Sequence, residues 1–350
     1  MIRTSFLFLA SLFLATATTI STPGPVPGTT SHYAHVGGHT YHYLRGRPVE
    51  VETAGTILLL HGYPDTSFGW RYQIPFLTSL GYQVIVPDML GYADTDAPAE
   101  LAEYTKQKLS ADMALLMDQI VPGEQVIVGG HDWGAGFAYK LAVWHPDLVK
   151  AYFTVSVPYW SPVFGLSAEP YDLSELVKNE SYRNLGYELQ WREFGFERNF
   201  ENETQIHWLL NAGYGGVTSN GTAALSPETG WDLSLFPHLL PNPIVNESDL
   251  AVYVEQLAKK GLRGPNNWYR VGQLDWQDEL SVAQTGTYVY HMPVLFIGAQ
   301  QDPILTPETW AGMEGHFDNL TIEPVEAGHW TLQEAPDDVN RVLSEWLAGL

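Results

Sequence analysis

The stretch Gln125-Val-Ile-Val-Gly-Gly-His-Asp-Trp-Gly-Ala-Gly136 decides the fold. An apolar, strand-like run at Gln125–Val128 leads into the pentapeptide Gly130-His-Asp-Trp-Gly134, and a helical pattern follows as far as Trp144. This pentapeptide has a small residue two positions before and two positions after its central residue, and it lies at a strand-to-helix turn. That is the pattern of a nucleophile elbow, in which the central residue is the nucleophile. Glycines are needed there because the turn crowds strand against helix and strains the central residue. The segment therefore predicts a sheet in which one strand ends on a candidate nucleophile, Asp132.

The central residue of this elbow is Asp132, where an esterase would carry a serine. A carboxylate is already ionised at neutral pH, so it can attack without the help of a base. It suits displacement at a saturated carbon, which leaves an alkyl ester on the enzyme for water to hydrolyse. A chance Gly-x-Asp-x-Gly in a glycine-rich loop is the alternative, but the flanking strand and helix favour the elbow.

Short apolar runs without polar alternation recur along the chain. They are Thr56–Leu60, Tyr82–Val86, Gln125–Val128, Tyr152–Ser156, Val294–Ile297 and Leu320–Ile322. Such runs are typical of parallel strands covered on both faces, and helical patterns between them, such as Lys108–Ile120, indicate a doubly wound α/β sheet. Residues 163–285 lack this alternation and are predicted to form an inserted, mostly helical lid. We therefore expect the α/β core in two parts, residues 31–162 and 286–350.

The N-terminal segment is predicted to be a targeting signal. Arg3 precedes the apolar run Phe6–Ala15, which ends at the small-residue site Ala15-Thr-Ala17. This is the pattern of a secretory signal peptide, and the run is too short to span a bilayer. We expect residues 1–17 to be removed, residues 18–30 to form a linker, and the mature protein to be secreted and free of the membrane.

Five Asn-x-Ser/Thr triplets agree with export. They begin at Asn179, Asn202, Asn220, Asn246 and Asn319. One such triplet is often accidental, but five of the chain's twelve asparagines lie in one. The sequence thus predicts a secreted glycoprotein.

Composition excludes several classes of function. Of 350 residues, 45% are hydrophobic and 16% charged, which is typical of a globular protein. With 17 Lys and Arg against 40 Asp and Glu, the net charge is −23, which argues against nucleic acid and anionic membranes as partners. The absence of cysteine excludes disulfides, a thiol nucleophile and zinc-thiolate or iron–sulfur sites.

Two further candidate catalytic residues follow predicted strands. Val294–Ile297 leads into Asp302, and Leu320–Ile322 leads into His329. Parallel strands present their ligand crevice at their carboxyl ends, and the chain order nucleophile, acid, histidine is that of hydrolases with this elbow. His329 would deprotonate the attacking water, and Asp302 would orient and stabilise its imidazole.

The loop Leu60-His-Gly-Tyr-Pro64 follows another predicted strand. The backbone N–H groups of Tyr63 and Trp133 are predicted to form an oxyanion hole for ester hydrolysis. We expect the substrate pocket to be lined by His61, Pro64, Trp133 and Trp330.

The chain resembles the α/β-hydrolase-fold epoxide hydrolases from about Tyr33 to the C-terminus. The similar segments are His61–Pro64, Trp70-Arg71, Pro87–Tyr92 with Asp94–Pro98, His131–Gly134 and Gly328–Trp330. Haloalkane dehalogenases share the core motifs and also use Asp on this elbow. The motifs therefore indicate a hydrolase with an Asp nucleophile without settling its substrate.

Two lid tyrosines are implied by the resemblance. In this family they bind and protonate the epoxide oxygen as the ring opens. Arg263–Arg270 is similar to the second lid segment and places one of the pair at Tyr269. Tyr187–Gly195 is similar to the first segment, Tyr-x-x-x-aromatic-Gln-x-x-Gly, except that Arg192 replaces the Gln. The resemblance implies conversion of an apolar epoxide and water to a vicinal diol, without a metal or organic cofactor.

Two alternatives stay open at this point. A haloalkane dehalogenase needs N–H donors for the departing halide, and Tyr63 stands where an Asn is common, although a lid Trp could replace it. A non-catalytic binding protein on the same fold usually lacks a triad member, whereas this chain keeps Asp132, Asp302 and His329. The sequence leaves the oligomeric state open.

Overall fold

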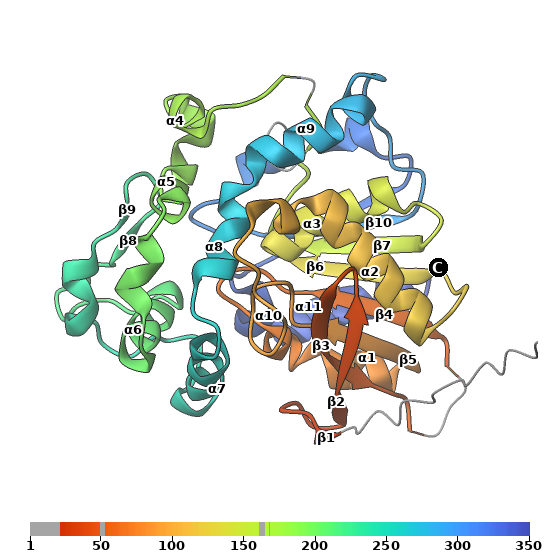
Figure 1. The fold of residues 1–350 in the computed structure, drawn as a ribbon, viewed down its shortest axis with the longest axis horizontal. Coiled ribbons are helices and arrows are strands. Elements are labelled where there is room, and N and C mark those ends of the chain that lie inside the picture. Colours follow the sequence, from red (N-terminus) through yellow and green to blue (C-terminus); the bar gives the residue numbers. More distant parts are fainter. Residues whose placement is uncertain (1–21, 50–52, 161–164, 168) are drawn as a thin grey trace, which may run out of the picture.

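The computed structural model describes residues 22–49, 53–160, 165–167 and 169–350 (Figure 1). Its main element is a nine-stranded sheet in the order β1-β2-β3-β5-β4-β6-β7-β10-β11. The pairs β1–β2, β2–β3 and β3–β5 are antiparallel, and all pairs from β5 to β11 are parallel. The strands are β1 (Thr22–Pro23), β2 (Thr29–Val36), β3 (His39–Gly46), β4 (Gly55–Leu60), β5 (Tyr82–Pro87), β6 (Val126–His131), β7 (Val149–Val155), β10 (Val294–Ala299) and β11 (Leu320–Val325). The predicted α/β class with a mostly parallel sheet is confirmed.

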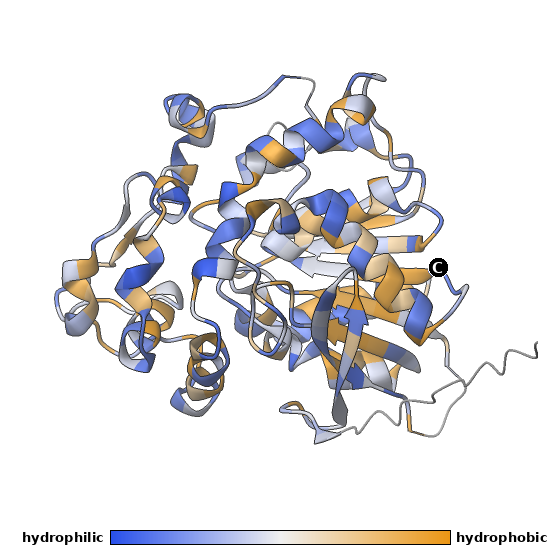
Figure 2. Ribbon diagram, viewed as in Figure 1, coloured by the Kyte–Doolittle hydropathy of each residue, from blue (hydrophilic) through white to orange (hydrophobic). Residues whose placement is uncertain are grey.

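The central strands are apolar because both of their faces are covered. Every residue of β6 and β10 is buried, and so are five of the six residues of β4. Hydrophobic colouring concentrates on these strands in Figure 2. A side chain at the end of such a strand is therefore held by a rigid, buried backbone.

Helices cover both faces of the sheet. They are α1 (Gln73–Ser79), α2 (Lys106–Ile120), α3 (Trp133–Trp144), α10 (Thr331–Glu334) and α11 (Pro336–Leu347), with short 3-10 helices at Ser67–Trp70, Leu101–Tyr104, Pro307–Trp310 and Met313–His316. In Figure 1, α2 and α3 pack together in front of the sheet, and α11 lies behind it. The buried face of α2 carries Leu109, Met113 and Leu116, the spacing of an amphipathic helix.

Between β7 and β10 the chain leaves the sheet and forms a mostly helical lid. Its helices are α4 (Leu173–Leu176), α5 (Glu188–Arg192), α6 (Glu203–Gly213), α7 (Glu247–Ala258), α8 (Arg263–Arg270) and α9 (Gly272–Ala283), with 3-10 helices at Glu180–Leu185, Phe196–Phe200 and Leu233–His238. A two-stranded sheet, β8 (Leu225–Ser226) with β9 (Gly230–Trp231), joins them. In Figure 1, α4 to α7 form a layer beside the core, whereas α8 and α9 return to it, with α9 in contact with α2.

The N-terminal linker expectation needs a correction. Thr22 and Pro23 pair with β2, and Thr29 and Thr30 already belong to β2, so four of the nine described residues of 18–30 lie in the sheet. The β-branched threonines favour an extended backbone, and the Gly24 N–H donates to the Thr29 carbonyl to close the hairpin. The predicted signal peptide and its cleavage site lie outside the described residues.

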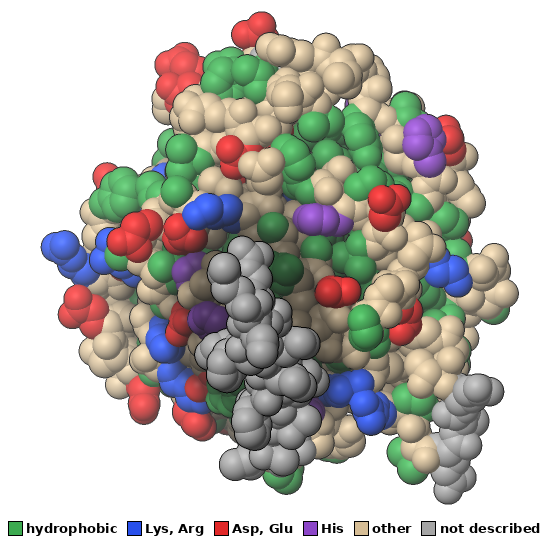
Figure 3. Space-filling model, turned by 45° about the vertical axis from the view of Figure 1, so that its right-hand side comes forward, with side chains coloured by type: hydrophobic (Ala, Val, Ile, Leu, Met, Phe, Trp, Pro, Cys, Tyr) green, Lys and Arg blue, Asp and Glu red, His purple; other side chains and the backbone are tan. Residues whose placement is uncertain are grey.

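The surface mixes acidic and basic side chains. On the face shown in Figure 3, Lys and Arg occur in small groups with Asp and Glu beside them. Among the described residues, no helix has both the length and the apolar character needed to cross a membrane.

Candidate active site

The elbow places Asp132 at the exact junction of β6 and α3. Its backbone has φ 53° and ψ −126°, in the left-handed half of conformational space that non-glycine residues rarely adopt. A Cβ on Gly130 would overlap the backbone of Gly134, and a Cβ on Gly134 would overlap the Leu60 carbonyl. Both glycines are therefore required by close backbone contact, and together they aim the Asp132 side chain away from the core.

His329 lies between two carboxylates. Its Nδ1 is 2.7 Å from Oδ2 of Asp302, and its Nε2 is 3.4 Å from Oδ2 of Asp132. Asp302 Oδ1 accepts hydrogen bonds from the N–H groups of Ile304 and Leu305 at 2.8 and 3.0 Å. The three residues predicted as a triad from distant parts of the chain thus meet in one place.

Charges within this cluster decide its ionisation. Burial opposes the charge on Asp132 and Asp302, but the hydrogen bonds and charge of His329 outweigh it and lower the pKa of both carboxyls. Burial would also lower the pKa of His329, yet Asp302 and Asp132 raise it well above 6.5. The resting cluster is consequently two carboxylates around an imidazolium, with Asp132 ionised and ready to attack.

The loop after β4 holds one oxygen of the nucleophile. The Tyr63 N–H donates to Asp132 Oδ1 at 2.7 Å, and a Cβ on Gly62 would overlap the Asp132 side chain. The second predicted donor, the Trp133 N–H, belongs to the first turn of α3 directly after the nucleophile. Oδ1 therefore points into the predicted oxyanion hole, and Oδ2 is the oxygen that faces His329.

A cavity of about 260 Å³ opens in front of Asp132 and His329. It is mostly apolar, and its walls come from both the core and the lid. They include Tyr63, Pro64, Tyr187, Trp191, Leu209, Leu225, Trp231, Ile244, Tyr269, Ile304 and Trp330.

Two residues predicted for this pocket lie elsewhere. His61 is buried beneath the loop, where its Nε2 accepts a hydrogen bond from the Met89 N–H at 2.9 Å, so it supports the loop instead of lining the cavity. The Trp133 side chain turns toward a second cavity and packs on the Lys106 ammonium, 5.1 Å from its ring centre. Neither orientation could be read from the motifs, because each depends on contacts with distant segments.

The two predicted lid tyrosines, Tyr187 and Tyr269, both line the cavity that holds Asp132. Tyr269 is fixed among aromatic rings, with the rings of Trp133 and Tyr63 edge-on at 5.0 and 5.2 Å. Burial, reinforced by nearby negative groups, raises the pKa of both phenols well above 10. Both hydroxyls therefore keep their protons and can donate hydrogen bonds into the cavity.

Comparisons with known proteins agree with this geometry. A sequence model described as the alpha/beta hydrolase fold matches residues 55–336. Over 334 residues the chain is 37% identical to epoxide hydrolase srdG of Neurospora crassa, covering 92% of this chain and 96% of that protein. The chain belongs to the α/β-hydrolase fold family and, within it, to the epoxide hydrolases. The resemblance to epoxide hydrolases that the sequence motifs indicate is thus confirmed.

Solved epoxide hydrolases share this hydrolase's architecture. An epoxide hydrolase from an endophytic Streptomyces has a TM-score of 0.75 and 26% identity, over 92% of this chain and 96% of that one. A mutant Vigna radiata epoxide hydrolase has a TM-score of 0.74 and 26% identity, over 92% of this chain and 99% of that one. Core and lid are thus both matched.

The sequence motifs missed the residues that hold the histidine loop of this hydrolase. Glu334 in α10 accepts hydrogen bonds from the two backbone N–H groups that flank His329, at 2.9 and 3.0 Å. His131 Nε2 and Ser156 Oγ donate to the His329 carbonyl at 2.8 and 3.0 Å. These four contacts fix the imidazole from the backbone side, and no spacing rule would have identified them.

One group of potential metal ligands occurs among the described residues of this hydrolase. The ligand atoms of His42, Asp88 and Asp94 lie within 4.8 Å of one another. However, His42 Nδ1 is 2.6 Å from Asp88 Oδ2, and the Lys259 ammonium is 2.8 Å from Asp94. Because the His42 ring N–H and the Lys259 ammonium already bind oxygens of Asp88 and Asp94, we interpret these three residues as a hydrogen-bonded cluster that supports the neighbouring loops.

Proposed function

We propose that this protein opens apolar epoxides to vicinal diols through a covalent ester on Asp132. The observation that carries the proposal is the shared cavity: a buried and a partly buried tyrosine from the lid line the same space as a carboxylate with a lowered pKa and its histidine. An epoxide needs both partners at once, because its carbon must be attacked while its oxygen receives a proton.

The first step is ring opening by Asp132. Oδ1 is held by the Tyr63 N–H, so Oδ2 attacks one ring carbon and forms a C–O ester bond. The C–O bond of the ring breaks, and its electron pair takes a proton from one phenol of the Tyr187–Tyr269 pair. The phenolate regains its proton from solvent, and the substrate is left as a hydroxyalkyl ester.

The second step is hydrolysis of the ester. Ester formation removes the charge of Asp132, one of the two charges that raise the pKa of His329. The imidazole can then lose its proton and act as the base that activates water, held by Asp302 at 2.7 Å. Water gives one proton to His329 and attacks the Asp132 carbonyl carbon, and Oδ1 takes up the negative charge beside the Tyr63 N–H. Collapse breaks the ester C–O bond to the substrate, and the leaving alkoxide takes a proton from the His329 imidazolium to form the diol. The carboxyl of Asp132 then returns its proton to His329, which restores the starting state.

The cavity favours uncharged, apolar substrates. Its walls are mainly aromatic and aliphatic, and the charged side chains on them are Asp132, His329 and Glu334. Glu334 is already engaged by two backbone N–H groups. A small aryl or alkyl epoxide can therefore pack against these rings. Because such a substrate is uncharged, its binding does not require that a charged group be removed from water.

The test is diol release from styrene oxide beside halide release from 1-bromobutane, with the purified protein. Diol without halide is the expected result. Halide without diol would establish the dehalogenase alternative and make the two tyrosines packing residues. Neither product over a broad substrate panel would favour the non-catalytic binding protein.

We also propose that the protein is secreted and glycosylated. All five predicted acceptor asparagines are exposed. Asn179, Asn202 and Asn246 cap helices through Oδ1, so the cap does not use the amide nitrogen to which a glycan is attached, although Asn202 Nδ2 donates to Gln205 Oε1 at 2.9 Å. The test is the protein from culture medium: its N-terminus should begin near Thr18, and N-glycosidase should lower its mass. An intact Met1 and an unchanged mass would reject the proposal.

A further inference from the structure

Helix α5 carries an ion pair next to a lid tyrosine in the chain, with its acidic member buried and its basic member partly exposed. Glu188 follows Tyr187, and Arg192 lies one turn later on the same helix face, at the place where the family segment has Gln. Arg192 Nη2 is 3.3 Å from Glu188 Oε2. The Glu188 side chain is 2% exposed, so its charge is held in a setting of low dielectric constant.

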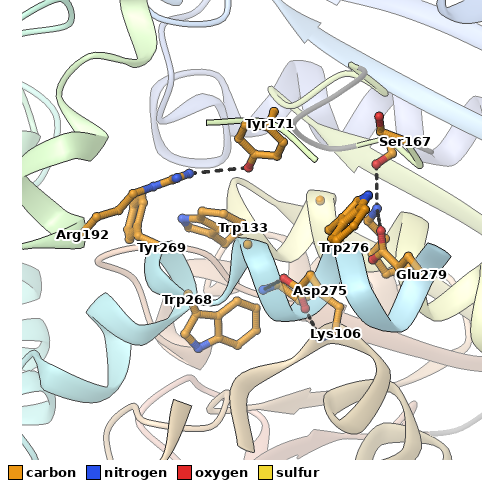
Figure 4. A pocket seen from close by; sticks show the side chains of 14 residues that line it. Lys106, Trp133, Ser167, Tyr171, Arg192, Trp268, Tyr269, Asp275, Trp276 and Glu279 are labelled. Atoms are coloured by element: carbon orange, nitrogen blue, oxygen red, sulfur yellow. Dashed lines mark hydrogen bonds and ion pairs between the residues drawn. The ribbon is translucent and has the colours of Figure 1, made fainter. Parts of the chain in front are cut away.

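The same guanidinium group of Arg192 also reaches a second, smaller cavity between lid and core. Its Nη2 lies 3.5 Å from the Tyr171 hydroxyl, and its guanidinium carbon lies 5.8 Å from the centre of that ring. Figure 4 shows Arg192 beside Tyr269 on the wall of this cavity, with Trp133 next to them. Arg192 and Tyr269 thus lie on the wall of the same cavity.

Several charged and titratable groups face the pair from the neighbouring elements. Asp132 acts on Glu188 from the end of β6, Tyr269 from α8, and Tyr171 from the segment before α4. Farther along, Arg270 of α8 is 2.6 Å from Glu197 and forms a separate ion pair. Arg192 is thus the positive group in direct contact with Glu188, and both tyrosines lie close enough to Asp132 and Glu188 to be affected by their charges.

Electrostatics connects this pair to ring opening. Burial raises the pKa of Glu188 to about 7, although Arg192 lowers it. An ionised Glu188 in turn raises the pKa of both Tyr187 and Tyr269, which makes each phenol a weaker acid. Giving a proton to the opening epoxide leaves negative charge on a phenol, and a carboxylate nearby opposes that charge.

We propose that Glu188 and Arg192 are positioning residues that set the acidity of the tyrosine pair during ring opening. Glu188 supplies the charge that opposes phenolate formation, and Arg192 compensates that charge and sets the pH at which it appears. The inference rests on the proposed function, since it concerns how the same tyrosines give up a proton. The competing explanation is that this ion pair only stabilises helix α5 and has no effect on the tyrosines.

The experiment is the pH dependence of the first step. The rate at which styrene oxide forms the ester is measured in single turnovers from pH 5 to 9. Wild type should slow by roughly three- to thirtyfold as the pH rises through about 7, because Glu188 ionises. In Glu188→Gln this inflection should disappear, and in Arg192→Gln it should move to higher pH, because the lost positive charge no longer lowers the pKa of Glu188.

The matched control is Arg341→Gln. Arg341 forms an ion pair with Glu345 at the same i, i+4 spacing and 3.3 Å distance, but on the exposed face of α11. This variant should keep the wild-type pH profile. Thermal unfolding of every variant shows whether a changed pH profile of the ester-forming rate is caused by a loss of folding stability.

Three outcomes would overturn the inference. They are a wild-type profile in both Glu188→Gln and Arg192→Gln, equal slowing of both at every pH, or an inflection in Arg192→Gln that moves to lower pH. If Glu188→Gln fails to fold, the direction of the shift in Arg192→Gln decides alone. If wild type forms no ester from any epoxide, the proposed function fails instead, which is a distinct result.

Discussion

At the residue scale, the site is organised around the charge of one histidine. His329 is flanked by carboxylates at 2.7 and 3.4 Å, so its positive charge favours ionised Asp132 before the reaction. Once Asp132 is esterified, only Asp302 remains to hold that charge. In the proposed mechanism, this change in charge on Asp132 converts His329 from a stabilising cation into a general base.

Removing one phenol tests the role of the tyrosines. Tyr269→Phe should slow ester formation about 100-fold, since one of two donors to the ring oxygen is lost, and Tyr187→Phe should slow it comparably. The measurement is the single-turnover rate with styrene oxide. Tyr33→Phe is the control, because Tyr33 is 52% exposed and far from the cavity lining. Wild-type rates in both lid variants would contradict the assignment.

Some residues could be predicted from the sequence, and others could not. Asp132, Asp302 and His329 each follow an apolar strand, so their shared location follows from the parallel topology alone. Glu188 and Glu334 carry no such signal. Their contacts are local, with Arg192 at i, i+4 spacing in one case and with the backbone of the histidine loop four to six residues away in the other. What the sequence does not show is that the fold places both segments beside the cavity.

At the element scale, the elbow depends on close contact between β4, β6 and α3. Gly134→Ala would place a methyl group against the Leu60 carbonyl, and neither backbone can yield without moving a central strand. The unfolding temperature should fall by about 5 °C or more, with loss of activity. Gly315→Ala is the matched control, because nothing lies within 4 Å of its Cβ position and its φ is not positive. Equal unfolding temperatures for Gly134→Ala and Gly315→Ala would contradict this explanation of the elbow.

The sheet was more predictable than the lid. Buried strands such as β4 and β10 appear in the sequence as uninterrupted apolar runs, whereas the short strands β8 and β9 have two residues each and no periodicity to detect. The lid helices are also short, and α4 and α5 have only four and five residues. Such elements are specified by packing on their neighbours, which a local pattern does not encode.

At the scale of the whole molecule, stability should depend on the buried carboxyl Asp65. Burial raises the pKa of this carboxyl to about 7, and the Thr66 N–H, Arg71 and the Tyr253 hydroxyl oppose the shift. In the unfolded chain the pKa returns to about 4. The folded state therefore holds a proton that the unfolded state releases, so this contribution to stability is present at low pH and is lost between pH 4 and 7.

Asp65→Asn tests this contribution through chemical denaturation at pH 5 and pH 8. The variant should lose less free energy of unfolding than wild type between these two pH values, by about 1 kcal/mol or more. Activity at each pH serves as the control for correct folding of the site. An identical pH dependence in the two proteins would mean that Asp65 keeps an ordinary pKa in the fold.

The most direct test of the central claim is to trap the covalent ester. His329→Gln removes the base for hydrolysis but leaves Asp132 and the phenols in place. After a single turnover with styrene oxide, mass spectrometry of this variant should show one added substrate mass on the peptide that contains Asp132. Asp132→Asn should show no added mass and no steady turnover. Steady diol release by either variant, or an adduct on another residue, would contradict the account.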